Sequence, residues 1–279
     1  MTVHRTDVAL SRRLERAEGS ANAAFVEARA RLAPGSGATW REVAGTYAMF
    51  DGVGSPLTQT FGLGLFAPAS ADDLATLEAF FAERGADVHH EVSPLADPAL
   101  LALLPARGYR PIELTSVVHR TLVTVPDAPP ASAAVRARPI APDEIERWAD
   151  TAARGWGETP ELAEFMRGFG LVSANSVGTV CFLAEIGDEA VAAGALAVHG
   201  GVALLAGAST LPAWRGRGAQ TALLAARLRH AVEQGCDLAM MGAQPGSTSQ
   251  LNAERQGFRI AYTRIKWERA AHGRPGATG

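Results

Sequence analysis

The chain has 279 residues, of which 47% are hydrophobic and 20% charged, as is normal for a globular protein. This length accommodates one large domain or two ordinary ones. The formal net charge of −3 excludes a global basic field for nucleic acid or an anionic membrane, so any anion site must be local. The cysteines, Cys181 and Cys236, lack metal-ligand spacing and fit a reducing compartment. The first residues show no signal-peptide pattern, and we expect a cytoplasmic protein.

The first half of the chain predicts alternating strands and helices. A β run at residues 57–65 precedes a helix that ends at Gly85. A short β run, a helix at 98–106 and a long β run at 111–123 follow in that order.

The next segment, residues 124–134, is rich in proline and small residues and is predicted to be a linker. The second half repeats the order of the first, with a helix end at Gly235 and a helix at 247–255. The repeat predicts two related α/β domains, which span residues 1–123 and 135–269, and a flexible tail at 270–279.

The second half has the clearer pattern. Residues 191–208 carry no formal charge and approach the length of a membrane span. Gly200 and Gly201 interrupt the run, however, so two buried strands joined by a hairpin turn explain it better. The predicted elements are strands at 135–140, 179–186, 191–199, 202–210 and 260–267, and helices from 142, over 160–169 and up to about 234.

The segment Thr210–Leu224 joins a predicted strand to a long amphipathic helix. The turn between them, RGRG, places Gly216 and Gly218 where positive φ and close backbone approach are needed. A turn of this kind leaves backbone N–H groups unpaired at the positive end of the helix. The N–H groups of about residues 217–222 therefore suit a phosphate or pyrophosphate.

This arrangement of strand, RGRGAQ turn, helix, strand, helix, "GF" and last strand resembles the GNAT acyltransferase superfamily. The superfamily's acyl-CoA signature is Gln/Arg-x-x-Gly-x-Gly/Ala, and Arg215 and Gly218 fill its first two positions. Gln220 departs from it at the third position but still offers its main-chain N–H. The resemblance covers about 135–269 and reaches the first half only through the repeat.

The resemblance implies an α/β (α+β) fold with two GNAT-like domains. Each would have a mixed, mostly antiparallel central sheet flanked by helices. It implies an enzyme that transfers acetyl from acetyl-CoA to the amino group of a small molecule by direct transfer in a ternary complex. We expect a monomer or homodimer with no metal, nucleic-acid or membrane partner. The alternative is a catalytically inactive tandem protein that binds CoA or has a regulatory role.

The resemblance also implies the cofactor-binding residues. The strand end is expected to splay from its neighbour and bind the pantetheine arm, and the N–H of Leu211 to contact the oxyanion. The predicted acyl-CoA contacts are Thr210, Leu211, Arg215, Gly216, Arg217, Gly218, Ala219, Gln220, Thr221, Ala222, Asn252 and Arg255.

The proton-transfer groups are less defined. Many family members have a tyrosine that acts as the general acid toward the CoA sulfur. At that position this chain has Ala253, with Asn252 and Arg255 as the nearby polar residues. Asn252 serves equally well as a helix-surface or capping residue. Glu158 and His199 are the weak catalytic candidates, and a surface carboxylate and a hairpin histidine are their ordinary alternatives. Glu161 stands beside Glu158 with the same two interpretations.

The first half departs from the signature. Asp72 and Asp73 follow the loop position, where they suit a helix start but repel a pyrophosphate. We expect this half not to bind CoA, and either to support the second half and close its acceptor pocket or only to bury surface. The residues His89 and His90 are adjacent on a strand, so they point to opposite faces and cannot share a metal.

Aromatic residues are the remaining acceptor candidates. Trp156, Trp40 and Tyr47 either line an apolar acceptor pocket or pack in the core, which is the default for large aromatic side chains.

Overall fold

The structure is a computed structural model that describes residues 6–123, 135–156 and 159–271. The chain divides into two compact units. The central unit comprises residues 120–241, and the terminal unit comprises residues 2–119 together with 242–279. The predicted linker at 124–134 and most of the predicted tail lie outside the described residues.

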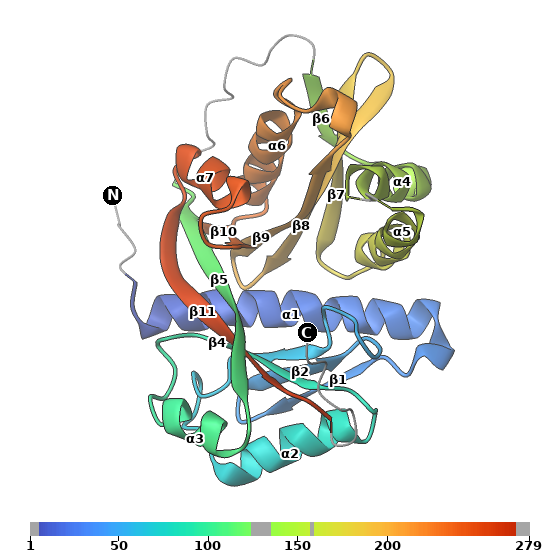
Figure 1. The fold of residues 1–279 in the computed structure, drawn as a ribbon. Coiled ribbons are helices and arrows are strands. Elements are labelled where there is room, and N and C mark those ends of the chain that lie inside the picture. Colours follow the sequence, from blue (N-terminus) through green and yellow to red (C-terminus); the bar gives the residue numbers. More distant parts are fainter. Residues whose placement is uncertain (1–5, 124–134, 157–158, 272–279) are drawn as a thin grey trace. The chain divides into compact units, whose positions relative to one another are not determined.

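The central unit has an α/β fold built on a mixed, mostly antiparallel sheet with strand order β10-β9-β8-β7-β6 (Figure 1). The pair β9–β10 is parallel, and the other pairs are antiparallel. Its strands are β6 (Val135–Pro139), β7 (Thr179–Ile186), β8 (Glu189–His199), β9 (Val202–Thr210) and β10 (Leu238–Ala243). Its helices are η2 (Pro142–Glu144), α4 (Ile145–Trp156), α5 (Pro160–Ala174), η3 (Pro212–Trp214) and α6 (Ala219–Glu233).

The uncharged stretch of the second half forms the predicted β-hairpin. β8 and β9 pair in antiparallel register from His199 opposite Val202 onward. Gly200 and Gly201 both adopt positive φ (55° and 74°), as a tight hairpin turn requires. In the described part of the chain, no helix is long and apolar enough to cross a membrane.

The helices of the central unit bury the residues that the sequence pattern selects. On α4, Trp148, Ala149 and Ala152 pack against apolar residues of β7 and β8. Helix α6 buries Leu223 and Leu228 and ends before Gly235, which has a φ of 76°. Both predicted amphipathic helices are therefore confirmed.

The strands of the terminal unit belong to the same 11-stranded sheet and follow the order β1-β2-β3-β4-β11-β5, so the two separate sheets that the sequence predicted are not observed. The pair β3–β4 is parallel, and the other pairs are antiparallel. Its strands are β1 (Thr39–Val43), β2 (Thr46–Phe50), β3 (Gln59–Phe61), β4 (Val88–Val92), β5 (Arg110–Thr121) and β11 (Arg259–Arg269). Its helices are α1 (Val8–Leu32), η1 (Pro34–Ser36), α2 (Ala71–Ala82), α3 (Leu100–Ala106) and α7 (Thr248–Arg255).

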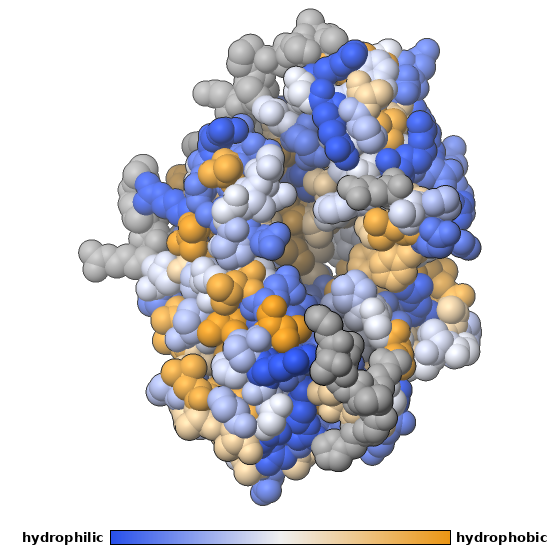
Figure 2. Space-filling view, in the orientation of Figure 1, coloured by the Kyte–Doolittle hydropathy of each residue, from blue (hydrophilic) through white to orange (hydrophobic). Residues whose placement is uncertain are grey.

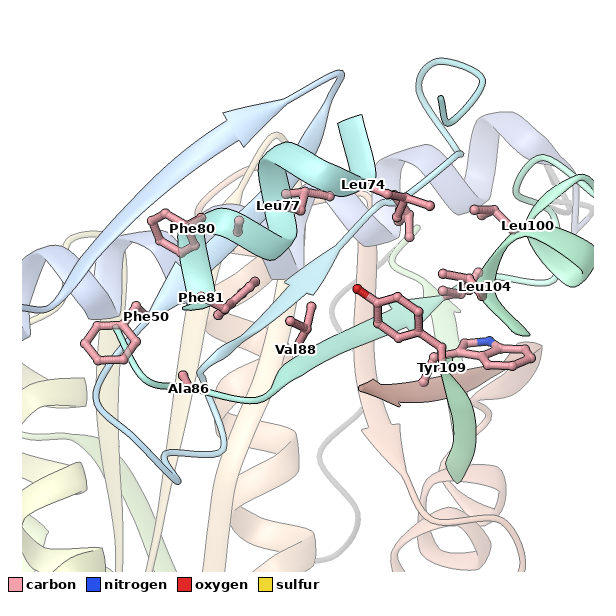
Figure 3. Close-up of a cluster of buried hydrophobic side chains, with 14 residues drawn as sticks. Phe50, Leu74, Leu77, Phe80, Phe81, Ala86, Val88, Leu100, Leu104 and Tyr109 are labelled. Carbon is pink, nitrogen blue, oxygen red and sulfur yellow. The ribbon is translucent and has the colours of Figure 1, made fainter. Parts of the chain in front are cut away.

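The main apolar cluster of the terminal unit joins helices α2 and α3 to the sheet (Figure 3). Leu77 and Phe81 from α2 and Leu104 from α3 meet Val88 of β4. Trp267 of β11 packs in the same cluster. The last strand of the chain thus completes the core of a sheet that begins in the first half.

The position of β11 differs from its place in the predicted second domain. It lies between β4 and β5, with Ile265 opposite Val92 on one side and Leu114 on the other. Tyr262 of β11 is also buried, and its hydroxyl donates to Glu15 Oε1 of α1 at 2.8 Å. Residues 242–271 therefore pack with the first half, while the domain boundaries themselves stay a prediction.

Candidate functional site

Strand β9 carries a bulge that separates it from β10. Its register with β8 shifts between Ala193 opposite Ser209 and Ala195 opposite Ala206. Gly207 and Ala208 therefore both stand opposite Gly194, and Gly207 has a φ of 59°. A bulge of this type bends its strand and increases the local twist.

The pairing of β9 with β10 ends shortly before this bulge. The last paired residues are Leu204 and Met240, whereas β9 continues to Thr210 and β10 to Ala243. The predicted separation of the strand from its neighbour is thus confirmed, and the bulge supplies its physical cause. Ala206 and Gly207 are exposed at this open edge.

The turn after β9 presents a run of unpaired backbone donors. The N–H groups of residues 216–221 have no hydrogen-bond acceptor among the described residues, whereas Ala222 donates to Gly218 O at 3.0 Å. Gly216 and Gly218 have φ values of 76° and 86°, and a Cβ on either would meet nothing within 4 Å. No side chain caps α6 at Gly218. This helix start is therefore open to an anion.

Two polar side chains of the turn are directed back toward the end of β9. Arg215 Nε donates to Thr210 O, and Arg215 Nη2 donates to Gly155 O, each at 3.3 Å. Gln220 Nε2 donates to Thr210 Oγ1 at 2.8 Å. Gln220, the residue that departs from the signature, thus fastens the first turn of α6 to β9. Arg217, which is exposed like Arg215, places its guanidinium 4.7 Å from the centroid of the Trp214 ring.

The C-terminal end of α4 lies against the same strand end. A Cβ on Gly155 would come within 2.5 Å of Ser209 Oγ and 3.1 Å of Thr210 N. Ser209 Oγ in turn donates to Ala152 O at 3.0 Å. Only glycine fits this contact, which places the following residue, Trp156, near the end of β9.

Trp156 is 46% exposed, so the core-packing interpretation does not apply to it. Leu162 and Phe165 of α5 are similarly exposed, and apolar side chains reach the surface over α4 and α5 (Figure 2). Trp40 and Tyr47 instead stack on each other in the terminal unit, with ring centroids 5.5 Å apart.

The N–H of Leu211 is not available for the oxyanion contact that the sequence suggested. It donates to Val191 O of β8 at 2.9 Å. Because successive residues of a strand direct their N–H groups to opposite neighbours, the N–H of Thr210 points away from β8. Among the described residues, no strand pairs with β9 beyond Leu204 on the side that faces away from β8. The N–H of Thr210 therefore replaces that of Leu211 as the candidate donor to the oxyanion.

His199 does not belong to this site. It pairs with Val202 at the start of β9, about 26 Å along the strand from Thr210 at 3.3 Å per residue. Burial lowers its pKa. Its neighbour in space is Gly178. Glu158 lies outside the described residues, and Glu161 is exposed in the first turn of α5.

The remaining predicted contacts, Asn252 and Arg255, are exposed on α7 of the terminal unit. Arg255 Nη1 donates to Asn252 Oδ1 at 3.5 Å, and Ala253 between them is buried.

The histidine pair of the terminal unit is oriented as predicted. His89 faces Glu268 at 3.3 Å, whereas His90 is buried between Thr60 and Tyr109. Burial lowers the pKa of His90 to about 3, so it is neutral. The described residues contain no group of histidine, cysteine or carboxylate side chains that could hold a metal.

Helix α2, at the corresponding place in the first half, starts with a capping box. Asp73 N donates to Ser70 Oγ at 3.0 Å, and Ser70 N donates to Asp73 Oδ2 at 3.1 Å. The start of α2 therefore carries a side-chain cap and two carboxylates, Asp72 and Asp73, whereas α6 has no side-chain cap and no acidic residue in its first turn.

Sequence reasoning missed Gly155, Ser209 and the buried Arg227 of α6. One signal was present for Arg227, which occupies a position in the apolar stripe of a helix.

Comparisons with known proteins agree with this geometry. Residues 118–246 match the family model described as an acetyltransferase (GNAT) domain. A GCN5-related N-acetyltransferase from Kribbella flavida has a TM-score of 0.64 and 20% identity, over 92% of this chain and 95% of that chain. A GCN5-related N-acetyltransferase from Sphaerobacter thermophilus gives 0.56 and 20%, over 78% and 73%.

A tandem GNAT protein from the clavulanic acid biosynthesis pathway has a TM-score of 0.59 and 14% identity, over 82% of this chain and 79% of that chain. No curated protein sequence matches the chain. At these identities the solved structures establish a shared fold. Residues 118–246 of this chain match the acetyltransferase (GNAT) domain model, and the whole chain has the fold of GNAT proteins.

Proposed function

We propose that this protein transfers an acetyl group from acetyl-CoA to the amino group of a small molecule, by direct transfer in a ternary complex. The observation that carries the proposal is the run of unpaired N–H groups at residues 216–221, beside the open edge of β9. Helix starts of this kind bind phosphate groups. The GNAT family model over the same region supports an acyl-CoA ligand.

Each part of the site has a proposed role in binding. The N–H groups at the start of α6 would hold the pyrophosphate, with Arg217 exposed beside them. The pantetheine arm would lie along the unpaired edge of β9 up to Thr210. Arg215 is committed to Thr210 O and Gly155 O, so its role is to fix the shape of the turn. Asn252 and Arg255 stay proposed contacts.

The chemistry requires little from the side chains. Acetyl-CoA would supply a thioester, to whose carbonyl carbon the neutral amine nitrogen forms the new C–N bond before the C–S bond breaks. The nitrogen loses one proton and the departing CoA thiolate takes up one, so the products are the amide and the CoA thiol. The chain contributes proximity, and the N–H of Thr210 would donate to the developing oxyanion. Trp156 and Phe165 provide an exposed apolar surface for the acceptor.

We also propose a tandem architecture in which only the second copy binds CoA. The element order β3-α2-β4-α3-β5 repeats as β9-α6-β10-α7-β11. The Ser70–Asp73 capping box occupies two N–H groups at the start of α2, and Asp72 and Asp73 add negative charge there. The first half would then support the fold and not bind a cofactor.

Calorimetry with acetyl-CoA tests the cofactor. We expect micromolar binding that the double variant Arg217→Glu, Gly218→Asp abolishes, because it places two carboxylates at the anion site. The matched control is Arg229→Glu, a charge reversal at an exposed position farther along α6. No binding by the unaltered protein at high micromolar acetyl-CoA would sink the proposal.

One observation favours a second candidate, a catalytically inactive CoA-binding or regulatory protein. Ala253 stands where related enzymes carry an acidic tyrosine, and it is 2% exposed. Acetyl-CoA binding without release of CoA thiol across a broad panel of amines would establish this alternative.

A further inference from the structure

Arg227 of α6 is a buried cation without a carboxylate partner. The residue is 2% exposed. Among the described residues its guanidinium donates to two main-chain oxygens, Leu223 O at 3.3 Å and Ala195 O at 3.2 Å, and to no carboxylate. Burial lowers its pKa to about 10, so it stays charged at neutral pH. A buried charge is costly, which makes its position informative.

The guanidinium lies against the bulge between β8 and β9. A Cβ on Gly194 would be 3.2 Å from Arg227 Cζ and Nη1. Gly194 is the residue of β8 that stands opposite both Gly207 and Ala208 of β9. Arg227 therefore fills the place that a side chain at Gly194 would need, and it binds the carbonyl of the next residue.

Trp148 of α4 contacts the same residue, Gly194, from the other face of the sheet. Its Nε1–H donates to Gly194 O at 3.3 Å and to Phe182 O at 3.1 Å. Ala193 and Ala195 pack in the cluster that contains Trp148. Because side chains alternate along a strand, Gly194 faces α6, so Trp148 and Arg227 approach the bulge from opposite faces.

We infer that Arg227 is a positioning residue which, together with Trp148, holds the β8–β9 bulge and so keeps the edge of β9 open toward β10. The consequence for acyl-CoA rests on the proposed function. The bulge bends β9 where its pairing with β10 ends, and the open edge extends from there to Thr210.

This role separates the effect on stability from the effect on the site. Replacing a buried charge by an apolar residue of similar volume is often neutral or stabilising. Arg227→Met should therefore fold with an unfolding midpoint equal to or above that of the unaltered protein. A side chain that served only the core would change nothing else.

Hydrogen exchange of the full chain without ligand tests directly whether Arg227 holds the β8–β9 bulge. Arg227→Met should accelerate exchange at least tenfold in residues 205–211 and leave β7 unchanged. Arg227→Lys, which retains the charge and a donor, should lie between Met and the unaltered protein. The control Arg229→Met changes an exposed arginine of the same helix and should have no effect.

Calorimetry with acetyl-CoA then measures the consequence for the site. Arg227→Met should weaken binding at least tenfold while Arg229→Met binds normally. Unchanged exchange in folded Arg227→Met would overturn the inference. If that variant does not fold, Trp148→Phe must accelerate exchange in residues 205–211, and its failure to do so is equally decisive. Faster exchange in Arg227→Met, with no acetyl-CoA binding by the unaltered protein, would reject the proposed function and support the positioning role of Arg227.

Discussion

Gln220 Nε2 donates to Thr210 Oγ1 at 2.8 Å, and this bond ties the first turn of α6 to the last residue of β9. The free N–H groups at residues 216–221 lie in the turn between β9 and α6 and in the first turn of α6. The bond therefore closes the base of the proposed anion site. It also explains why a long polar side chain stands at a position that is usually small in proteins with this signature.

Removal of the Gln220–Thr210 bond should weaken acetyl-CoA binding moderately. A neutral hydrogen bond contributes about 0.5–1.5 kcal/mol, which corresponds to a loss of roughly two- to twelvefold in affinity. Gln220→Ala and Thr210→Val should each have this effect, and calorimetry of both single variants and the double variant gives their coupling. Additive losses in the double variant would show that the bond does not shape the site.

Gly155→Ala should destabilise the central unit. The new Cβ would lie within 2.5 Å of Ser209 Oγ, and overpacking of this kind costs about 1–3 kcal/mol. Chemical denaturation measures the change in the free energy of unfolding. The control is Gly168→Ala on α5, where a Cβ meets nothing within 4 Å. Because alanine is the better helix former, that variant should gain about 0.5–1 kcal/mol. Equal effects at both positions would contradict the packing argument.

The buried Glu15 of α1 should make stability depend on pH. Burial, opposed by Arg264 and reinforced by Glu18 and Glu91, raises the pKa of Glu15 from 4.5 to about 7. A carboxyl whose folded pKa is raised holds its proton in the folded state while the unfolded chain has lost it. Its stabilising contribution is thus complete below pH 4.5 and is lost as the pH rises to about 7.

Glu15→Gln removes this titration but retains an acceptor for the Tyr262 hydroxyl. The difference in unfolding free energy between the unaltered protein and Glu15→Gln should fall from pH 4.5 to 7 and then level off. A flat profile for Glu15→Gln would show that Glu15 ionises normally.

Neither cysteine should react in the folded protein. Both thiols are buried, and burial raises the pKa of Cys181 to about 12 and that of Cys236 above its usual value. The reactive thiolate is therefore scarce. Mass spectrometry after iodoacetamide treatment should show no alkylation under native conditions and two modified cysteines in denaturant. Rapid native alkylation of Cys181 would mean that β7 opens locally.

The elements of the central unit could be predicted because their patterns are local. The Gly200-Gly201 turn, the apolar stripe of α6 and the glycines of the RGRG turn each act within a few residues. Helix α1 escaped prediction, since alanine and glycine occupy many of its buried positions and give little contrast in hydrophobicity. The short strands β1 and β2 were missed for lack of an alternating pattern, and β2 is buried throughout.

The sequence by itself determined the glycine turn before α6, because glycine conformation and free N–H groups at a helix start are properties of adjacent residues. Only the tertiary structure decided which backbone groups at the strand end stay free. The N–H of Leu211 donates to Val191 O, and the pairing of β9 with β10 ends shortly before the bulge opposite Gly194. Only the tertiary structure, too, placed β11 beside β4 and β5. Strand pairing joins residues far apart in the chain, and their partners leave no local pattern from which the pairing can be deduced.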